Sequence, residues 1–217
     1  MDQHFFITGI QDGCKAILKD SLSYLNAVEA YGGPPDDDSI VNFIAQMTPR
    51  FPAALIVFGD TVKELMPATS PAFGQPRSFR VKCLFTVICC DDNLRGEVER
   101  QRGDLASPGV VKMFSDVNDQ LSGRQLARKD DTIVVLVAGK PTPAGYTLLT
   151  HGPLTPIGER FLELPGITCY AADFETHFNW TEPDRRAAGI QVEEIVFDVS
   201  ATSVNKNPVQ LPGVIIE

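Results

Sequence analysis

Acidic residues follow two of the predicted strands. Of the side chains in this sequence, their carboxylates are the best candidates for metal binding or catalysis. Asp60 comes just after the apolar run 51–58, and Asp91 and Asp92 come directly after the apolar run 79–90. Carboxylates at neighbouring strand ends can hold a divalent cation, and a bound cation can activate water. Aspartate is also common after strands because it tolerates turn geometry. We favour the turn, and keep a small metal-dependent enzyme that uses these three aspartates as an alternative.

The other reactive side chains form no recognisable catalytic pattern. Asp173, Glu175 and His177 alternate on a predicted strand, where a solvated strand face explains them more simply than a metal site. The three histidines are far apart in the chain, and glycine-rich phosphate loops and the G-x-S-x-G motif are absent. The five cysteines lie mainly in apolar segments, as expected of reduced, buried thiols. We expect a protein without catalytic activity, cofactor or metal.

Length and composition set further bounds. The 217 residues suffice for one sizeable core, and 43% hydrophobic residues is an ordinary globular content. A net charge of −9 argues against a nucleic-acid-binding protein, which needs a basic face. No apolar run approaches the ~20 residues that span a bilayer. The N-terminal residues lack the pattern of a signal peptide, and we expect no membrane partner.

Hydrophobic periodicity predicts the elements that must position these side chains. The clearest is 79–90, where apolar residues occupy every second position, as in a long half-buried strand. The remaining pattern predicts helices over 8–30, from about 39 to 47 and from about 108 to 121, strands at 51–58, 132–137, 146–150 and 170–180, a loop or protruding hairpin at 61–78, and a bulge or break near 193–194.

This order of elements predicts an α+β fold. We expect a mixed or antiparallel sheet flanked by helices, which we place on one side. The run 132–137 is apolar at nearly every position, which predicts a buried strand. We expect one domain over 1–217, with a possible protruding loop at 59–78 and a C-terminal strand or arm region at 185–217.

Four phrases, in order, resemble the Mu-like bacteriophage tail terminator family (Mu gene product K and its prophage relatives). They lie within roughly residues 10 to 178. Each phrase by itself marks only a part or an end of a helix or strand and also occurs in unrelated folds. They are Tyr24-Leu25-x-x-Val28-x-x-Tyr31; Phe51-Pro52-Ala53-Ala54-Leu55-Ile56-Val57-Phe58-Gly59; Asn93-Leu94-Arg95-Gly96 with Arg100-Gln101-Arg102-Gly103; and Pro108-Gly109, Asp116-Val117 and Leu121-x-Gly123-x-x-Leu126.

The resemblance implies a ring-forming structural protein of the virion. Such a ring, of six copies, caps the head-proximal end of the tail tube and joins the tail to the neck. Its implied partners are other copies of itself, the tail tube protein, the sheath protein of a contractile tail and a neck or head-completion protein. DNA only passes through the lumen, and assembly takes place in the host cytoplasm. Another head–tail connector or neck protein is the alternative within this class.

Besides the loop at 59–78, two segments are candidate contact surfaces of such a ring. The first is the turn Asp91, Asp92, Asn93, Leu94 and Arg95, within a predicted surface loop at 91–104. The second is the apolar C-terminal tip Val214, Ile215 and Ile216, which could add as a strand to a neighbouring subunit's sheet or form an edge strand of its own domain.

Overall fold

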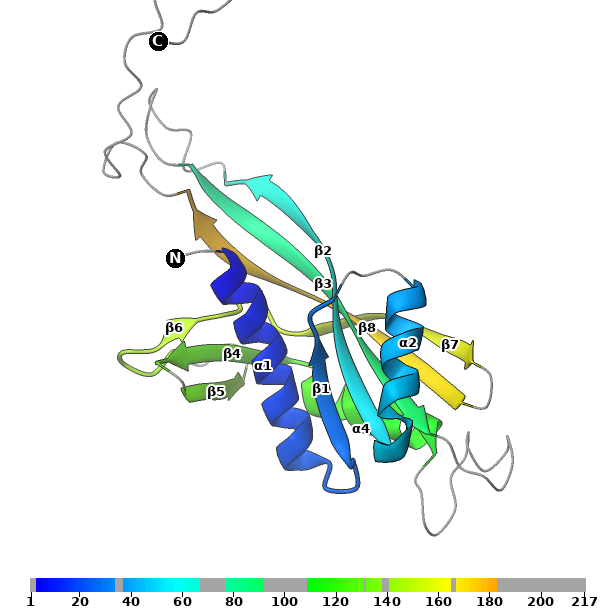
Figure 1. The fold of residues 1–217 in the computed structure, drawn as a ribbon. Helices are drawn as coiled ribbons and strands as arrows, with labels where there is room; N and C mark the ends of the chain where they lie inside the picture. Colours follow the sequence, from blue (N-terminus) through cyan, green and yellow to red (C-terminus); the bar gives the residue numbers. More distant parts are fainter. Residues whose placement is uncertain are drawn as a thin grey trace, which may run out of the picture.

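The computed structural model describes residues 3–33, 37–66, 77–91, 109–130, 132–137, 141–164 and 167–182 (Figure 1). Its centre is a pair of long antiparallel strands, β3 (Ser78–Asp91) and β8 (Ile167–Thr181). They pair without interruption from Ser78–Thr181 to Asp91–Thr168. The two long strands predicted from period-two alternation are therefore confirmed.

These two strands belong to a five-stranded mixed sheet in the order β1-β2-β3-β8-β7. The outer members are β1 (Ala27–Tyr31), β2 (Ala53–Leu65) and β7 (Thr155–Leu164). β1 runs parallel to β2, and every other pair is antiparallel. The crossover from β1 to β2 passes through α2 (Asp37–Met47) and the 3₁₀ turn η1 (Thr48–Arg50). The predicted α+β class with a mixed sheet is confirmed.

A second sheet has three strands in the order β5-β4-β6. Its members are β5 (Thr132–Val137), β4 (Arg124–Lys129) and β6 (Thr147–Leu148). It follows α4 (Val110–Leu121), which ends near the predicted C-cap Gly123. Gly123 has a φ of 74°, a conformation that glycine adopts without strain, and its N–H donates a hydrogen bond to the Leu154 carbonyl at 3.0 Å.

Helices cover both faces of the large sheet, which corrects the prediction of one side. α1 (Gln3–Ser21) and α4 lie on one face, and their core includes Cys14, Met113, Phe174 and Phe178. α2 lies on the other face, where Ile44 and Met47 join a second core. The five cysteines are all free and buried, in agreement with the prediction. Within the described residues, no helix is long and apolar enough to cross a membrane.

The first predicted helix is too long, because β1 takes its last residues. Leu25 and Val28 fit the helical spacing, yet α1 ends at Ser21. The chain then turns at Asn26, whose N–H donates to the Pro52 carbonyl at 2.9 Å and whose Nδ2 donates to the Phe51 carbonyl at 2.6 Å. These bonds align β1 with β2, so pairing with a distant strand overrides local periodicity.

The strand predicted at 51–58 is too short, because β2 continues beyond a bulge that interrupts its apolar pattern. Gly59 and Asp60 read as a turn, whereas β2 shifts register between Phe58 and Thr61 and continues to Leu65. A Cβ at Gly59 would lie 3.3 Å from the Leu84 carbonyl oxygen, so the bulge brings the two backbones close. Of the two alternatives for 61–78, the described residues therefore form a hairpin.

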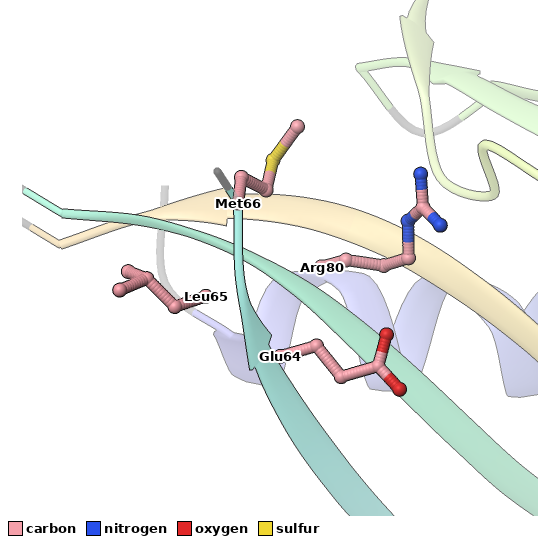
Figure 2. Close-up of a pocket in the computed structure, with 4 residues that line it drawn as sticks. All are labelled: Glu64, Leu65, Met66 and Arg80. Atoms are coloured by element: carbon pink, nitrogen blue, oxygen red, sulfur yellow. The ribbon is translucent and has the colours of Figure 1, made fainter. Parts of the chain in front are cut away.

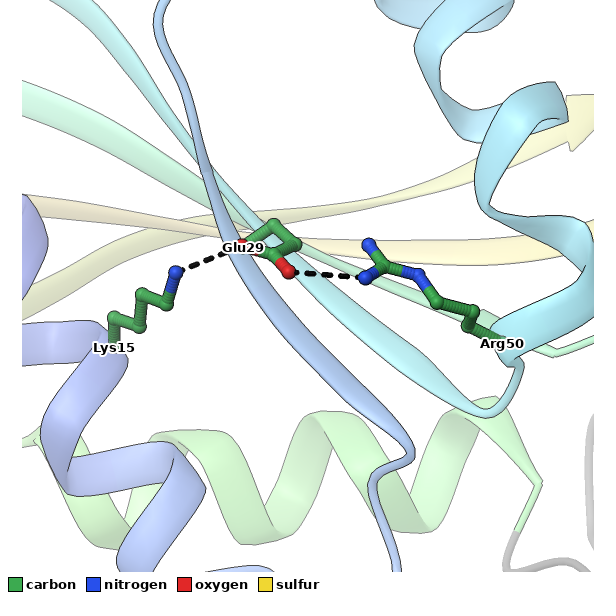
Figure 3. Close-up of polar contacts among 3 residues, drawn as sticks. All are labelled: Lys15, Glu29 and Arg50. Atoms are coloured by element: carbon green, nitrogen blue, oxygen red, sulfur yellow. Dashed lines mark hydrogen bonds and ion pairs between the residues drawn. The ribbon is translucent and has the colours of Figure 1, made fainter.

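An ion-pair cluster fastens β1 to the helices on either side of it (Figure 3). The Glu29 carboxylate accepts hydrogen bonds from Lys15 of α1 at 2.7 Å and Arg50 of η1 at 3.2 Å. The hydrogen bond from Lys15, with the positive charges of both partners, lowers the pKa of Glu29 below its ordinary value of 4.5. The charged form is therefore favoured in the folded chain.

We expect Glu29→Gln to lower the free energy of unfolding by about 0.5–1 kcal/mol at pH 7, because the partners are partly solvent-exposed. A lowered folded-state pKa contributes stability above the unfolded-state pKa, and this is lost as the pH falls through the folded-state value. The difference between the variant and the parent should therefore shrink below pH 4.5. Urea melts at pH 7 and at acidic pH measure it. A pH-independent difference would contradict this origin.

Candidate interaction surfaces

The structure separates the acidic residues of the metal-site alternative. Thr61 pairs with Cys83 and Phe58 with Phe85, so Asp60 lies level with Leu84 of β3. Asp91 is seven residues further along β3, on the order of 23 Å away. Asp60 instead accepts a hydrogen bond from the Thr61 N–H at 2.6 Å, at the bulge of β2. The proposed convergence of strand ends is wrong, because β2 continues past its bulge. Asp92 lies outside the described residues.

The second acidic group, on β8, is engaged in pairing across the sheet. Asp173 accepts a hydrogen bond from the Thr86 hydroxyl at 2.6 Å and forms an ion pair with Arg160 of β7. The His177 ring packs against Gly152, where an added Cβ would lie 2.4 Å from the ring, and burial lowers the pKa of His177. Among the described residues, no group of three His, Cys, Asp or Glu side chains could hold a metal ion.

The predicted contact residues fall mostly outside the described residues. Asp91 is 2% exposed at the end of β3, so its side chain offers little surface to a neighbour in the single chain. Asp92, Asn93, Leu94, Arg95, Val214, Ile215 and Ile216 are not described. A contact role for these eight residues stays a prediction.

Several residues of the four phrases are joints within the fold. The Tyr24 hydroxyl donates a hydrogen bond to Oδ2 of Asp116 at 2.7 Å, which connects the loop after α1 to α4. The Asp116 carboxylate also binds Lys112, one helical turn earlier. Leu121 and Leu126 are fully buried in the core next to α1. These residues of the four phrases stabilise the fold, so other residues must provide the contact surfaces.

We expect Tyr24→Phe to lower the free energy of unfolding by about 1–2 kcal/mol, because it leaves the partly buried Asp116 carboxylate without its phenol donor. Tyr146→Phe is the matched control, since the Tyr146 side chain has no hydrogen bond within the described residues. Chemical denaturation of both variants measures the effect. Equal stabilities would show that the Tyr24–Asp116 bond contributes nothing.

A three-stranded arm projects beyond the N-terminal end of α1 (Figure 1). It consists of β2 after its bulge, the start of β3 and the end of β8, and we define it as residues 61–66, 77–83 and 176–182. The Glu182 N–H donates to the Arg77 carbonyl at 2.9 Å and the Met66 N–H to the Ser78 carbonyl at 3.1 Å, so pairing continues to the tip. The arm offers two faces to a partner.

One face of the arm carries an apolar row. Leu65 pairs with Phe79, and Phe79 pairs with Trp180, so the three side chains lie side by side across the strands. The Phe79 and Trp180 rings are 5.8 Å apart, and the Lys63 ammonium lies 5.0 Å from the Trp180 ring. Leu65 is 50% exposed. An exposed apolar side chain beside two aromatic rings is typical of a protein contact.

The opposite face of the arm is charged. Glu64 and Arg80 extend to one side of β2 and Leu65 to the other (Figure 2). These three residues and Met66 line a pocket. Glu64 forms an ion pair with Lys82 at 2.8 Å. This face offers charged groups of both signs and no catalytic set. The sequence predicts 59–78 as a candidate contact loop but misses that 61–65 continues as a paired strand, because the bulge shifts the apolar phase between Phe58 and Leu65.

Comparison with known proteins connects the chain to a bacteriophage family. The family described as "Bacteriophage Mu, Gp37" matches residues 6–179. A search of curated proteins finds no match. Among solved structures, the chain is similar to a chain of the "Virion of native gene transfer agent (GTA) particle", at 10% identity and a TM-score of 0.36, over 80% of this chain and 97% of that one. At that TM-score the structural likeness carries no weight. The family match spans most of the chain, and the protein belongs to the bacteriophage Mu Gp37 family.

Proposed function

We propose that the chain is a structural virion protein that forms a ring, caps the head-proximal end of the phage tail tube and joins the tail to the neck. The observation that carries this proposal is the arm, where the exposed Leu65 lies beside the partly buried rings of Phe79 and Trp180 and offers a protein contact at the end of a packed domain. Membership of a phage Mu family supports a role in the phage particle. A capping ring needs such contacts and needs no catalytic residues.

The proposal includes a defined set of partners. They are five further copies in a six-membered ring, the tube protein, the sheath protein if the tail contracts, and a neck protein. DNA passes through the lumen without being held. The net charge of −9 suits such a lumen, because like charges repel the phosphate backbone. A lumen that is neutral or basic in the assembled ring would contradict this part.

The direct test mixes the purified protein with isolated tail tubes for negative-stain electron microscopy. We expect a cap on one end of each tube and free rings elsewhere on the grid. Tubes with both ends bare at saturating protein would contradict the proposal. Binding to the portal complex in place of the tube would identify another neck connector.

We expect Leu65→Glu to reduce the fraction of capped tubes at least tenfold, because it places a charge in the apolar row of the arm. The matched control is Ile157→Glu, which changes a side chain of similar exposure (53% against 50%) on β7, away from the arm. Both variants should keep the parent's melting temperature within a few degrees. Equal capping by both variants would show that the arm does not carry the tube contact.

A further inference from the structure

β5 is apolar on both faces, yet it lies at the surface. Its sequence, Thr132–Val137, reads T-I-V-V-L-V and contains no charge, proline or glycine. The prediction of a strand is confirmed, but none of the side chains at 132–136 is buried, and Val135 is 42% exposed. A strand that is apolar on both faces is typical of a sheet interior. The composition of β5 is therefore typical of a strand that is buried on both faces, although β5 is not buried in the single chain.

β5 is also the edge of its sheet. Within the described residues it pairs only with β4, and its outer side meets no other strand (Figure 1). Val135 lies opposite Leu126, which is fully buried beneath α1. α1 also reaches β5, where Ile133 packs against the core, yet Val135 stays exposed towards the outer edge. Natural proteins protect such edges, because unpaired backbone groups beside apolar side chains bind other strands.

The edges of the large sheet carry protection that β5 lacks. At β1, the Gln11 side-chain amide donates to the Tyr31 carbonyl at 3.3 Å, and Glu29 is held between two cations. At β7, a register shift between Pro156 and Gly158 interrupts the strand. Side-chain caps, charges, prolines and bulges are the usual protections of edge strands. β5 has no charge, proline or register shift, which marks it as a strand to be paired in the assembly.

We propose that the outer edge of β5 binds the C-terminal segment Pro212–Glu217 of a second copy of this chain as an added strand. The segment's residues Val214, Ile215 and Ile216 are apolar and β-branched, like most of β5, and only its last residue is charged. Residues 183–217 follow the arm, and at roughly 3.3 Å per extended residue they reach on the order of 100 Å. That reach covers the distance to a neighbouring subunit.

The choice of donor rests on the proposed ring. Ring contacts are heterologous, so an edge meets a different segment of its neighbour and not its own copy. Strand addition gains affinity from backbone hydrogen bonds and specificity from alternate side chains. A β5-to-β5 pair would instead close a two-fold dimer and end assembly there.

Cross-linking between two separately made variants tests the pairing. Val135→Cys and Ile215→Cys subunits are mixed and treated with a mild thiol oxidant, with the parent chain as control because its five cysteines are buried. We expect a disulfide-linked pair that contains one of each variant. Absence of this mixed disulfide, or the formation of Val135→Cys homodimers only, would overturn the proposal.

Substitution at the edge gives an independent readout. We expect Val135→Lys to raise the dissociation constant of the oligomer at least tenfold in light-scattering measurements. Val111→Lys is the matched control, because Val111 on α4 is similarly exposed, at 49% against 42%. Assembly of Val135→Lys equal to that of the control would overturn the proposal.

Deletion of residues 213–217 tests the same pairing if Val135→Lys folds poorly. The deletion leaves every described residue in place. Unimpaired oligomers after this deletion would also overturn the pairing. Cross-linked oligomers that fail to cap tail tubes would count against the proposed function and leave the pairing standing.

Discussion

Phe178→Ala is expected to lower the free energy of unfolding by about 3–5 kcal/mol, the largest effect that we predict for a single substitution. Phe178 of β8 is fully buried, and its ring stacks on Phe6 of α1 with centroids 4.5 Å apart. Removing it leaves a cavity where the base of the arm meets the first helix. The cost includes both the lost burial and the unfilled space, because a packed core relaxes only in part.

Phe161→Ala is the matched control for this substitution. Phe161 is 37% exposed on β7, where its ring lies 6.1 Å from that of Tyr170. Urea titration followed by fluorescence of Trp180, the only tryptophan, measures both variants. A Phe178→Ala variant as stable as Phe161→Ala would mean that α1 does not secure β8.

Gly13→Leu should have the next largest effect, a loss of about 1–3 kcal/mol or more from overpacking. α1 crosses the small sheet on two glycines one turn apart. A Cβ at Gly13 would lie 2.7 Å from Cδ1 of Leu126, and one at Gly9 would lie 2.8 Å from Cδ2 of Leu149. Replacing glycine within a helix normally gains about 0.5–1 kcal/mol, so the clash must exceed that gain.

The matched control is Ala16→Leu on the exposed side of the same helix, which should change stability by less than about 0.5 kcal/mol. Combining Gly13→Leu with Leu126→Ala should recover part of the loss, because the smaller residue leaves room for the new side chain. Thermal melts of the parent, Gly13→Leu, Leu126→Ala and the double variant complete this double-mutant cycle. Strictly additive losses would show that the two positions are not in contact.

Much of this fold was predictable because most of the long elements bury one face. In β3 from Phe79 to Cys89 and in β8 from Tyr170 to Trp180, every second side chain faces the core beneath α1 and α4. The strands β7 and β1 were not predicted, because neither has the alternating pattern of a strand that buries one face. β7 is exposed on both sides over residues 155–161, so no alternation marks it. β1 is a parallel strand placed by hydrogen bonds from Asn26 to a segment 25 residues away, which no local window contains.

The candidate surfaces were harder to predict, for a related reason. The bulge after Phe58 moves Val62 and Leu65 out of the register of 51–58, so a continuing strand reads as a loop. The run 132–137 reads as buried because it is apolar on both faces, whereas β5 lies at the edge of the small sheet and leaves Val135 exposed.

The path of β8 has a consequence for the order of assembly. β8 starts beneath α2 and ends at the tip of the arm, where the Glu182 N–H bonds to the Arg77 carbonyl. The segment that follows is therefore tethered to the tip of the arm. Once an arm engages any neighbour, the tether raises the effective concentration of residues 212–217 at that neighbour's surface, as a linker does in a bivalent ligand. In the proposed ring, two individually weak contacts would then act as one avid attachment, and a subunit held by only one of them would be free to leave.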